Sequence, residues 1–348
     1  MTKSIKNLHP ERILIRSTNW IGDAIMTTPA VRTIRQNFPQ AHIAILVHPW
    51  VADVFSASPH VDETILYKKK SDHKGLGGMW RLSRELSRKA FDIAILLQNA
   101  FEAALITYLA QIPVRAGFNR DGRGLLLTHS VSIGKGLRKI HQVHYYQGLL
   151  KNLGLICGPD ELFLEISEGN REWASDLLRQ RRSVGPLIGL NPGAAYGPAK
   201  RWPAEKYGDL ASRLVRELDA TVIVFGTQAD QKAAEIIRQR TSGSIVDLCG
   251  KTDLGQALAV IKECRCFVTN DSGLMHVAAA LQTPLVAIFG STDHIATGPF
   301  SKNSAVVRKE LSCSPCLKPD CRKDFECMMQ IGVDEVFANV GTLLNTRE

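Results

Sequence analysis

The chain has 348 residues, of which 45% are hydrophobic. This length exceeds what one hydrophobic core usually fills, and the apolar residues are spread evenly, so we expect two domains of ordinary size. No apolar run approaches the roughly 18 residues that a membrane-spanning helix needs, and the first residues lack the apolar stretch of a signal peptide. The sequence therefore predicts a protein of the cytosol.

The charge balance is basic. Lysine and arginine outnumber aspartate and glutamate by 43 to 34, which gives a formal net charge of +9. Such an excess favours an acidic partner: nucleic acid, anionic lipid or a phosphorylated sugar. Aromatic residues make up only 7% of the chain, and the sequence contains no RNA-binding, helix-turn-helix or zinc-finger signature. We therefore expect no nucleic-acid partner.

Apolar runs of strand length recur along the chain and predict strands at residues 12–17, 42–47, 63–68, 91–97, 187–191, 221–226, 244–249, 265–270 and 284–290. Stretches long enough for a helix separate most of them, an order typical of parallel sheets that are covered on both faces. We therefore predict an α/β protein with two doubly wound, Rossmann-like domains, residues 1–183 and 184–332. Two such domains that face a central cleft suit an enzyme with two substrates.

The first predicted strand runs directly into a helix. From Gly22 to Phe38 apolar residues recur at helical spacing, and Pro29 either interrupts this helix or begins its main part, with Thr28 as the cap. Gly22 and Asp23 then lie at the strand-to-helix turn, on the edge of the sheet that faces a ligand. Asp23 suits a general base at this place. Its alternative role is to cap the helix and to favour the positive helix N-terminus.

A loop rich in glycine and proline, NPGAAYGPAKRWP, follows the strand at residues 187–191. Its composition lets the backbone approach a ligand closely before a helix begins near Pro203. Lys200 and Arg201 end this loop. One of these cations would meet a diphosphate, whereas the alternative is that both are solvated loop charges.

The segment VTNDSGLMHVAAAL places Asp271, Ser272 and Gly273 between a strand and an alanine-rich helix. Free backbone amides at such a helix start bind anions, and Gly273 carries no side chain that would obstruct a phosphate. Ser272 adds a hydroxyl donor, and His276 lies one turn into the helix. The alternative is an ordinary helix cap followed by a structural histidine.

The eight cysteines form two groups. Four are scattered in or near apolar segments, where we expect small buried hydrophobic residues: Cys157, Cys249, Cys264 and Cys266. The other four are clustered: Cys313, Cys316, Cys321 and Cys327. Four thiolates would suit a structural zinc ion or an iron–sulfur cluster, but the later spacings match no common zinc-finger pattern, and reduced thiols are the alternative.

Three blocks, NWIGDAIMTTPAVRTIR, PGAAYGPAKRWP and TNDSGLMHVAAAL, resemble the ADP-heptose:lipopolysaccharide heptosyltransferases, family nine of the glycosyltransferases. The blocks follow the family's order and spacing, and the resemblance covers nearly the whole chain. The GPAKRWP form most resembles heptosyltransferase II members, which add the second inner-core heptose. The resemblance implies a GT-B fold, an ADP-heptose donor in the C-terminal domain, a lipid-linked acceptor in the N-terminal domain and no required metal or other cofactor. It also implies a final helix, within residues 333–348, that crosses back to the N-terminal domain.

The resemblance also implies roles for single residues. Asp23 matches the proposed base, and Lys200 matches the cation that neutralises the departing ADP. The donor contacts that it implies, or that the position in the fold suggests, are Gly22, Asp271, Ser272, Gly273 and His276. To these we add Asp230, by analogy with the acidic residue that follows this strand in dinucleotide-binding folds.

The acceptor side is less specific. Cations of the N-terminal half are candidates for the acidic groups of an acceptor whose sugars are Kdo and heptose linked to lipid A, in peripheral contact with the inner membrane face: Arg115, Arg120, Arg123, Arg138, Lys139 and Lys68 to Lys70. Three alternatives remain open: a relative that adds the first or third heptose, a non-catalytic nucleotide-binding protein of the same fold, and a cysteine-ligated redox or metal protein.

Overall fold

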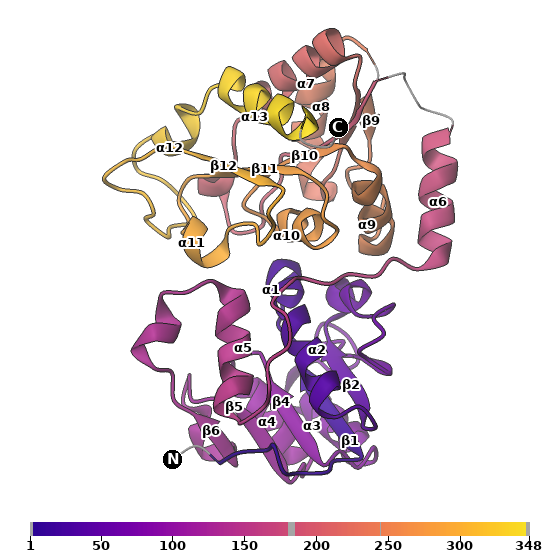
Figure 1. Ribbon diagram of the computed structural model, residues 1–348, viewed down its shortest axis with the longest axis vertical. Coiled ribbons are helices and arrows are strands. Elements are labelled where there is room, and N and C mark those ends of the chain that lie inside the picture. Colours follow the sequence, from indigo (N-terminus) through magenta and orange to yellow (C-terminus); the bar gives the residue numbers. More distant parts are fainter. Residues whose placement is uncertain (1–2, 180–184, 244, 346–348) are drawn as a thin grey trace. The chain divides into compact units, whose positions relative to one another are not determined.

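The computed structural model describes residues 3–179, 185–243 and 245–345. The chain divides into two compact units, Met1–Glu165 and Ile166–Glu348 (Figure 1). The domain boundary expected between residues 183 and 184 lies outside the described residues. The structure places the division earlier, because helix α6 (Glu168–Arg179) packs against α9 (Leu254–Glu263) of the second unit.

Six parallel strands form the sheet of the first unit, in the order β3-β2-β1-β4-β5-β6. They are β1 Arg12–Arg16, β2 His42–Val47, β3 Glu63–Leu66, β4 Ile93–Leu96, β5 Val114–Phe118 and β6 His129–Val131. This is the order of a doubly wound fold, in which the winding reverses between β1 and β4. β1 lies at the centre, where Ile13 pairs with Ile43 on one side and with Ile93 on the other.

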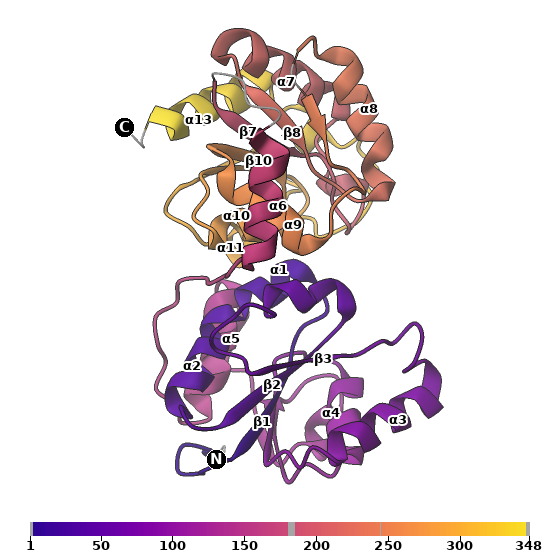
Figure 2. The same ribbon diagram turned by 90° about the vertical axis from the view of Figure 1, so that its right-hand side faces the viewer.

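Helices cover both faces of this sheet. They are α1 Ile21–Met26, α2 Thr28–Asn37, α3 Gly75–Ser87, α4 Phe101–Leu109 and α5 Gln142–Asn152, with short 3-10 helices at Pro49–Val54, Arg123–Leu126 and Lys135–Arg138. α3 packs beside α4 on one face, and α2 packs beside α5 on the other (Figure 2). Leu82 and Leu86 of α3 are fully buried together with Leu14 of β1, so the apolar stripe of the helix closes the core on its face.

The segment from Gly22 to Phe38 forms two helices. Pro29 lies in the first turn of α2, as expected for a residue that begins the main helix. The expected cap role of Thr28 is wrong, because its hydroxyl donates backward to the Ile25 carbonyl at 2.8 Å. The Thr27 hydroxyl donates in the same way to Ala24, at 2.6 Å. These bonds satisfy the last carbonyls of α1 and let α2 follow at once.

The second unit repeats this topology with six parallel strands in the order β12-β11-β10-β7-β8-β9. They are β7 Leu187–Asn191, β8 Thr221–Val224, β9 Ile245–Asp247, β10 Cys266–Asn270, β11 Leu285–Phe289 and β12 Ser304–Arg308. The winding reverses between β7 and β10, in the same way as between β1 and β4 of the first unit. Each unit is thus a doubly wound, Rossmann-like fold.

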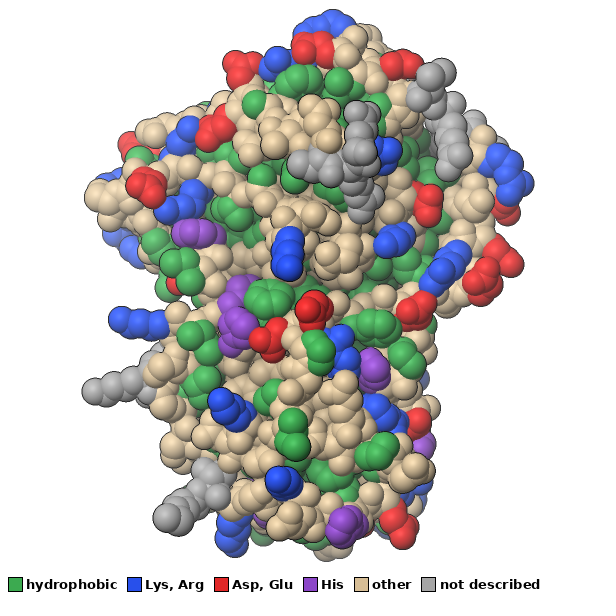
Figure 3. Space-filling view, in the orientation of Figure 1, with side chains coloured by type: hydrophobic (Ala, Val, Ile, Leu, Met, Phe, Trp, Pro, Cys, Tyr) green, Lys and Arg blue, Asp and Glu red, His purple; other side chains and the backbone are tan. Residues whose placement is uncertain are grey.

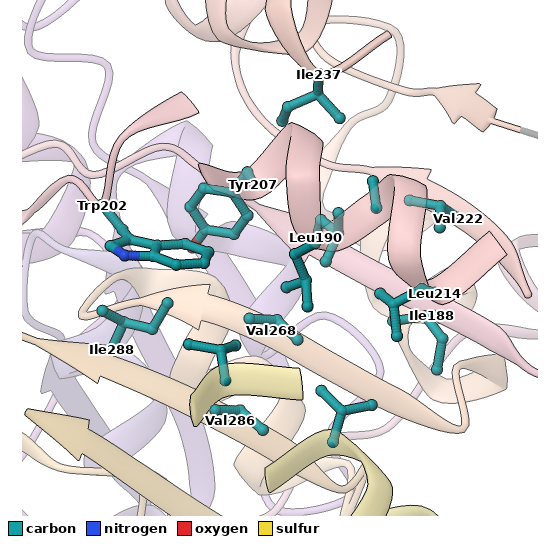
Figure 4. Packing of buried hydrophobic residues seen from close by; sticks show 14 of the residues in the cluster. Ile188, Leu190, Trp202, Tyr207, Leu214, Val222, Ile237, Val268, Val286 and Ile288 are labelled. Atoms are coloured by element: carbon teal, nitrogen blue, oxygen red, sulfur yellow. The ribbon is translucent and has the colours of Figure 1, made fainter. Parts of the chain in front are cut away.

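Besides α6 and α9, the second unit contains α7 Ala204–Leu218, α8 Gln231–Arg240, α10 Gly273–Ala280, α11 His294–Thr297, α12 Glu326–Met329 and α13 Val333–Asn345, with 3-10 helices at Pro198–Lys200 and Gln228–Asp230. Figure 4 shows its core, where the Trp202 ring meets Tyr207 edge-on at 4.9 Å. The indole N–H donates to the Ile331 carbonyl at 3.1 Å, so the one polar atom of this buried side chain is satisfied. Among the described helices, none combines the length and the apolar character that crossing a membrane requires.

The final helix belongs to the second unit. α13 packs against α7 and against β10, β11 and β12, and the side chains of Val336 and Val340 are fully buried there. That the final helix crosses back to the first domain, as the resemblance implies, stays a prediction. The described part of α13 buries its apolar stripe in the core of its own unit; residues 346–348 lie outside the described part of the chain.

The sequence predicted nine of the strands to within a few residues at each end, but β5, β6 and β12 lie where it predicted none. β5 contains Arg115 and Gly117, which interrupt the apolar pattern. β6 has three residues, and both β6 and β12 are edge strands. Such short segments are held by pairing with a neighbouring strand, which a local apolar pattern does not reveal.

Candidate functional site

The candidate residues gather at the carboxyl ends of strands, where the winding of each sheet reverses. In open α/β sheets the crevice at this point is where ligands bind. In the first unit the loop after β1 leads into α1, which carries Asp23. In the second unit the glycine-rich loop follows β7, and Asp271 and Ser272 follow β10. Each unit therefore presents its motif at the expected edge.

Asp23 lies in the first turn of α1 and is half-buried. α1 contacts α5, which carries the fully buried Tyr146. Burial, followed by the negative charge of Asp23, raises the pKa of the Tyr146 hydroxyl well above its ordinary value. The Gly22 backbone beside Asp23 is buried. The carboxylate thus occupies a partly desolvated position at the carboxyl edge of the sheet, as a general base requires.

A network that the sequence did not suggest holds the loop in front of Asp23. The Arg16 guanidinium is fully buried and donates to Asn19 Oδ1 at 2.9 Å and to the Leu46 carbonyl at 3.3 Å. Burial lowers its pKa to about 10. The indole N–H of Trp50 donates to the Asn19 carbonyl at 2.9 Å. The signal in the sequence was an arginine inside the apolar run RILIRS.

Two hydroxyls of the same loop are buried without a hydrogen-bond partner, those of Ser17 and Thr18. Ser17 is fully buried and Thr18 is 5% exposed. Most buried polar atoms in proteins are hydrogen-bonded, so an unsatisfied pair beside a strand end indicates a place where a ligand or water can supply the partner. This pair lies between β1 and the helix of Asp23.

In the second unit a hydrogen-bond network joins the ends of β7 and β10. The Asn191 amide donates to Thr269 Oγ1 at 2.9 Å and to Ser272 Oγ at 2.7 Å. Ser272 is the N-cap residue of α10, yet its side chain makes no capping bond to the helix. The Ser272 hydroxyl is therefore held by Asn191, and the first-turn amides of α10, beginning at Gly273, are not capped by it. This arrangement suits an anion at the helix start.

Lys200 and Asp271 come together from two different motifs. The ammonium lies 2.6 Å from Asp271 Oδ2, and the two side chains are 15% and 5% exposed. Thr292 donates a second hydrogen bond to the same carboxylate oxygen at 2.5 Å. The ammonium also lies 5.0 Å from the centre of the Tyr196 ring. Of the two cations that end the loop, Lys200 is thus the one directed to the end of β10.

Asp230 and Arg201 form hydrogen bonds and an ion pair that hold a neighbouring loop. The Asp230 carboxylate accepts bonds from the Thr227 amide at 2.9 Å and from the Thr227 hydroxyl at 2.8 Å, and is 8% exposed. Arg201 lies 3.9 Å from it and donates to the Ala194 carbonyl at 3.0 Å. A Cβ atom at Gly193 would lie 2.7 Å from Asp230 Oδ2, so a larger residue at this position would require the Asp230 side chain to shift. Asp230 caps its 3-10 helix, and its ribose contact stays a prediction.

His276 lies within α10, and its side chain is 3% exposed. The helix places it one turn beyond Ser272, as the spacing predicted. Its burial gives it a packing role, and a part in donor binding stays a prediction.

The three candidate acceptor arginines differ in their surroundings. Arg123 is fully buried: Nε donates to the Phe118 carbonyl at 2.8 Å, Nη2 donates to Asn99 at 3.1 Å and Nη1 donates to the Gln98 carbonyl. Burial lowers its pKa to about 10. Arg123 thus ties the ends of β4 and β5 together, and its contact with an acceptor stays a prediction.

Arg115 is half-buried, donates to the Leu126 carbonyl at 2.7 Å and to the Ile112 carbonyl at 2.5 Å, and so fastens a loop. Arg120 is exposed. Of the three arginines, Arg120 has the most exposed side chain, so a soluble or membrane-bound anion can reach it most easily. The side chain of Arg138 lies outside the described part of the chain.

The four clustered cysteines line one cavity, together with Ala199, Ser291, Ser314, Lys323 and Glu326. All four are free thiols. Burial, followed by the other three cysteines, raises the pKa of the Cys327 thiol. Across the described residues, however, no three His, Cys, Asp or Glu side chains are arranged to hold a metal ion. The thiols share a cavity without forming a coordinating set.

The cysteine loop supports the glycine-rich loop. The Tyr196 hydroxyl donates to the Leu317 carbonyl at 2.8 Å, and the Ala199 amide donates to the Pro319 carbonyl at 3.1 Å. A Cβ atom at Gly197 would lie 2.3 Å from the Pro319 carbonyl oxygen, and Gly197 has a φ of +153°. Glycine is therefore required where the two loops meet.

The chain is similar to known proteins over most of its length. Residues 79–325 match the model of glycosyltransferase family 9 (heptosyltransferase). Lipopolysaccharide heptosyltransferase 2 of Salmonella typhimurium is 34% identical over 347 residues, which cover 96% of this chain and 99% of that protein.

Two solved structures share the fold. The Escherichia coli ADP-heptose lipopolysaccharide heptosyltransferase II is 31% identical, with a TM-score of 0.83 over 97% of this chain and 99% of that one. The family 9 glycosyltransferase of Veillonella parvula is 26% identical, with a TM-score of 0.87 over 97% and 98%. Together with two doubly wound units and motifs at both winding reversals, these matches establish that the chain belongs to glycosyltransferase family 9, whose members are GT-B enzymes.

Proposed function

We propose that this enzyme transfers L-glycero-D-manno-heptose from ADP-heptose to the heptose and Kdo inner core of lipopolysaccharide, and that it adds the second heptose. The observation that carries the proposal is the pairing of Lys200 with Asp271 beside the uncapped start of α10, in one unit, while the other unit presents Asp23 at the corresponding edge. Support for the second heptose comes from the full-length similarity to heptosyltransferase 2 proteins.

The donor occupies the second unit in this proposal. Its diphosphate binds the first-turn amides of α10, where Gly273 leaves room and the Ser272 hydroxyl is oriented by Asn191. Lys200 neutralises the charge that develops on the diphosphate as the sugar leaves. Asp271 holds this ammonium within the site before the donor arrives, and the Thr292 hydroxyl donates to the Asp271 carboxylate.

The acceptor reacts from the first unit. Asp23 removes the proton from an acceptor heptose hydroxyl, whose oxygen forms a bond to the anomeric carbon. The bond from this carbon to the diphosphate oxygen breaks in the same displacement, ADP departs, and the configuration inverts. The proposal requires Asp23 and Lys200 to act on one donor–acceptor pair.

For the acidic groups of the acceptor we propose contacts with Arg120 and with Lys68 to Lys70. Lys70 lies 5.5 Å from the centre of the half-exposed Trp50 ring, whose N–H is bound to the loop in front of Asp23. Lys68 and Lys69 are paired with Asp72 and Glu102 at 3.0 and 2.6 Å. These cations lie on the same unit as Asp23, so we propose that they form ion pairs with the acidic groups of the acceptor.

The deciding experiment incubates the purified enzyme with ADP-heptose and a core acceptor that carries one heptose, and measures the mass of the product. We expect a gain of one heptose. An acceptor with Kdo alone and an acceptor with two heptoses are the matched controls, because they separate the second addition from the first and the third. No gain with any acceptor would leave a non-catalytic nucleotide-binding protein.

We further propose that the enzyme acts in the cytoplasm at the inner membrane face and needs no cofactor for transfer. No step of the proposed reaction uses the cysteine cluster. Elemental analysis of the purified protein tests the remaining reading as a structural zinc or iron–sulfur site. Stoichiometric metal would support that reading.

A further inference from the structure

The positive charge of the chain is concentrated in one segment. Residues 68–89 contain eight lysines or arginines and two acidic residues, and so carry six of the nine net charges of the chain. On the face of the molecule in Figure 3, by contrast, cationic and anionic side chains are interspersed. The segment comprises the loop after β3 and helix α3 of the first unit.

α3 has two distinct sides. Met79, Leu82 and Leu86 are buried against the sheet. Two other large apolar side chains of the same helix are exposed: Leu76 is 81% exposed and Trp80 is 54% exposed. Neighbouring exposed apolar side chains with a polar rim are typical of surfaces that contact another protein or a membrane.

The exposed apolar pair continues into a basic stripe. Leu76, Trp80, Arg84 and Arg88 follow one another at a spacing of four residues, which places them along one line of the helix surface. The Arg84 guanidinium lies 4.8 Å from the centre of the Trp80 ring. Lys74 before the helix and Arg81 beside the stripe are also exposed. We call Lys74, Leu76, Trp80, Arg81, Arg84 and Arg88 the α3 surface.

The acidic residues nearby pair with side chains outside the α3 surface: Glu63 with Lys89 at 2.5 Å and Glu102 with Lys69 at 2.6 Å. Asp72 is paired with Lys68 at 3.0 Å, and Glu85 lies 3.3 Å from the ring of His73, which is buried. Tyr108 of the neighbouring helix α4, which packs beside α3 (Figure 2), is 49% exposed. The α3 surface therefore combines exposed apolar side chains with exposed lysines and arginines.

We propose that the α3 surface docks the enzyme on an anionic lipid bilayer, with Leu76 and Trp80 inserted at the headgroup level and the arginines and lysines paired with lipid phosphates. An interfacial helix of this kind combines a leucine and tryptophan side with lysine and arginine, and binding needs both apolar insertion and charge. Tryptophan suits the boundary between lipid and water. The inference rests on the proposed function to the extent that a lipid-linked acceptor explains the need for docking.

The test uses the full-length protein and acceptor-free vesicles. Co-sedimentation is measured with phosphatidylethanolamine vesicles that contain phosphatidylglycerol, and with phosphatidylcholine vesicles that carry no net charge. We expect binding to the anionic vesicles, and weaker binding when salt is raised, because salt screens the headgroup attraction.

Two double variants divide the two contributions: Leu76→Ser with Trp80→Ser, and Lys74→Glu with Arg84→Glu. The charge-reversing variant should weaken anionic vesicle binding at least about tenfold, since each cation near such a surface contributes about fivefold and two are reversed. The Leu76 and Trp80 variant should weaken the same binding because it removes the apolar insertion. The matched controls are Ile156→Ser, at a 71% exposed position of the same unit, and Lys232→Glu, at an exposed position of α8. The controls should bind as the unmodified enzyme does.

A parallel assay separates this inference from the proposed reaction. With an acceptor freed of its acyl chains, all four variants should transfer heptose at the unmodified rate. Failure of the unmodified enzyme to transfer would reject the proposed function and leave vesicle binding as measured. The docking inference is overturned if the unmodified enzyme ignores anionic vesicles, or if both α3 double variants bind them normally. It is equally overturned if the α3 surface proves, by sedimentation velocity, to be a contact between two copies that excludes lipid.

Discussion

The Lys200 ammonium lies 2.6 Å from the Asp271 carboxylate, although the two residues belong to motifs 71 positions apart in the sequence. The pair is nearly buried beside the start of α10. A cation in this place can serve two purposes, because it both satisfies a buried carboxylate and offers charge to a diphosphate. The two purposes can be separated by experiment.

Replacing Lys200 by alanine should weaken ADP-heptose binding and slow transfer, because charge is removed from the diphosphate before and during its departure. It should also lower the free energy of unfolding by about 1 to 3 kcal/mol, since Asp271 is left buried without its cation. Kinetics with varied donor and chemical denaturation measure the two effects. Adding Asp271→Asn to Lys200→Ala should restore stability without restoring the rate. If the single variant kept normal kinetics, Lys200 would be a structural residue only.

Replacing Asp23 by asparagine should leave ADP binding intact and reduce transfer by at least about 100-fold, the lower end of what a positioned base contributes. The amide keeps the size of the side chain and cannot accept the proton. Calorimetry with ADP and product formation over time are the measurements. Asp160→Asn is the matched control, on a half-exposed carboxylate of the same unit that pairs with His144 at 3.1 Å. Near-normal turnover of the Asp23 variant would exclude the role of base.

Replacing Asn191 by aspartate should weaken ADP binding at least about tenfold. The change is isosteric, but it places a carboxylate where the amide now donates to Ser272 Oγ at 2.7 Å, and this charge repels a diphosphate at the start of α10. Titration calorimetry with ADP measures the loss. Asn303→Asp, at an exposed position of the same unit, should bind ADP normally. Equal affinity for both variants would place the diphosphate elsewhere.

Arg123 and Arg120 should separate stability from acceptor binding. Arg123→Met removes three buried hydrogen bonds and should lower the free energy of unfolding by about 2 to 4 kcal/mol, with the KM for the acceptor unchanged. Arg120→Met should leave stability unchanged and raise the KM for the acceptor. Thermal unfolding and acceptor titrations decide. The opposite pattern would show that the buried guanidinium, and not the exposed one, recognises the acceptor.

Local pattern was sufficient for much of the secondary structure. Runs such as residues 187–191 and 284–290 are apolar because their strands are buried on both faces, and this requirement is written in adjacent residues. The helix that begins after Pro203 and the helix after Ser272 were predicted for the same reason. The turn positions of Asp23 and Gly273 followed, since a strand and a helix must be joined there.

Other features depended on contacts between distant segments. The edge strand β6 exists because β5 offers it partners, and α6 belongs to the second unit because α9 receives its apolar side. The position of α13 likewise depends on the core of the second unit, in which its residue Val336 is buried. The sequence alone does not state which surface an apolar stripe will meet, because many partners are compatible with the same stripe.

At the candidate site, the sequence by itself determined which chemical groups are present and that they follow strands: a carboxylate after β1, a lysine after β7, and a serine and glycine after β10. Only the tertiary structure decided that Lys200 meets Asp271, that Asn191 holds Ser272, and that Arg123 is buried while Arg120 is exposed. The physical reason is that residue type and spacing set local conformation, whereas pairing and burial depend on which distant segments the fold brings together.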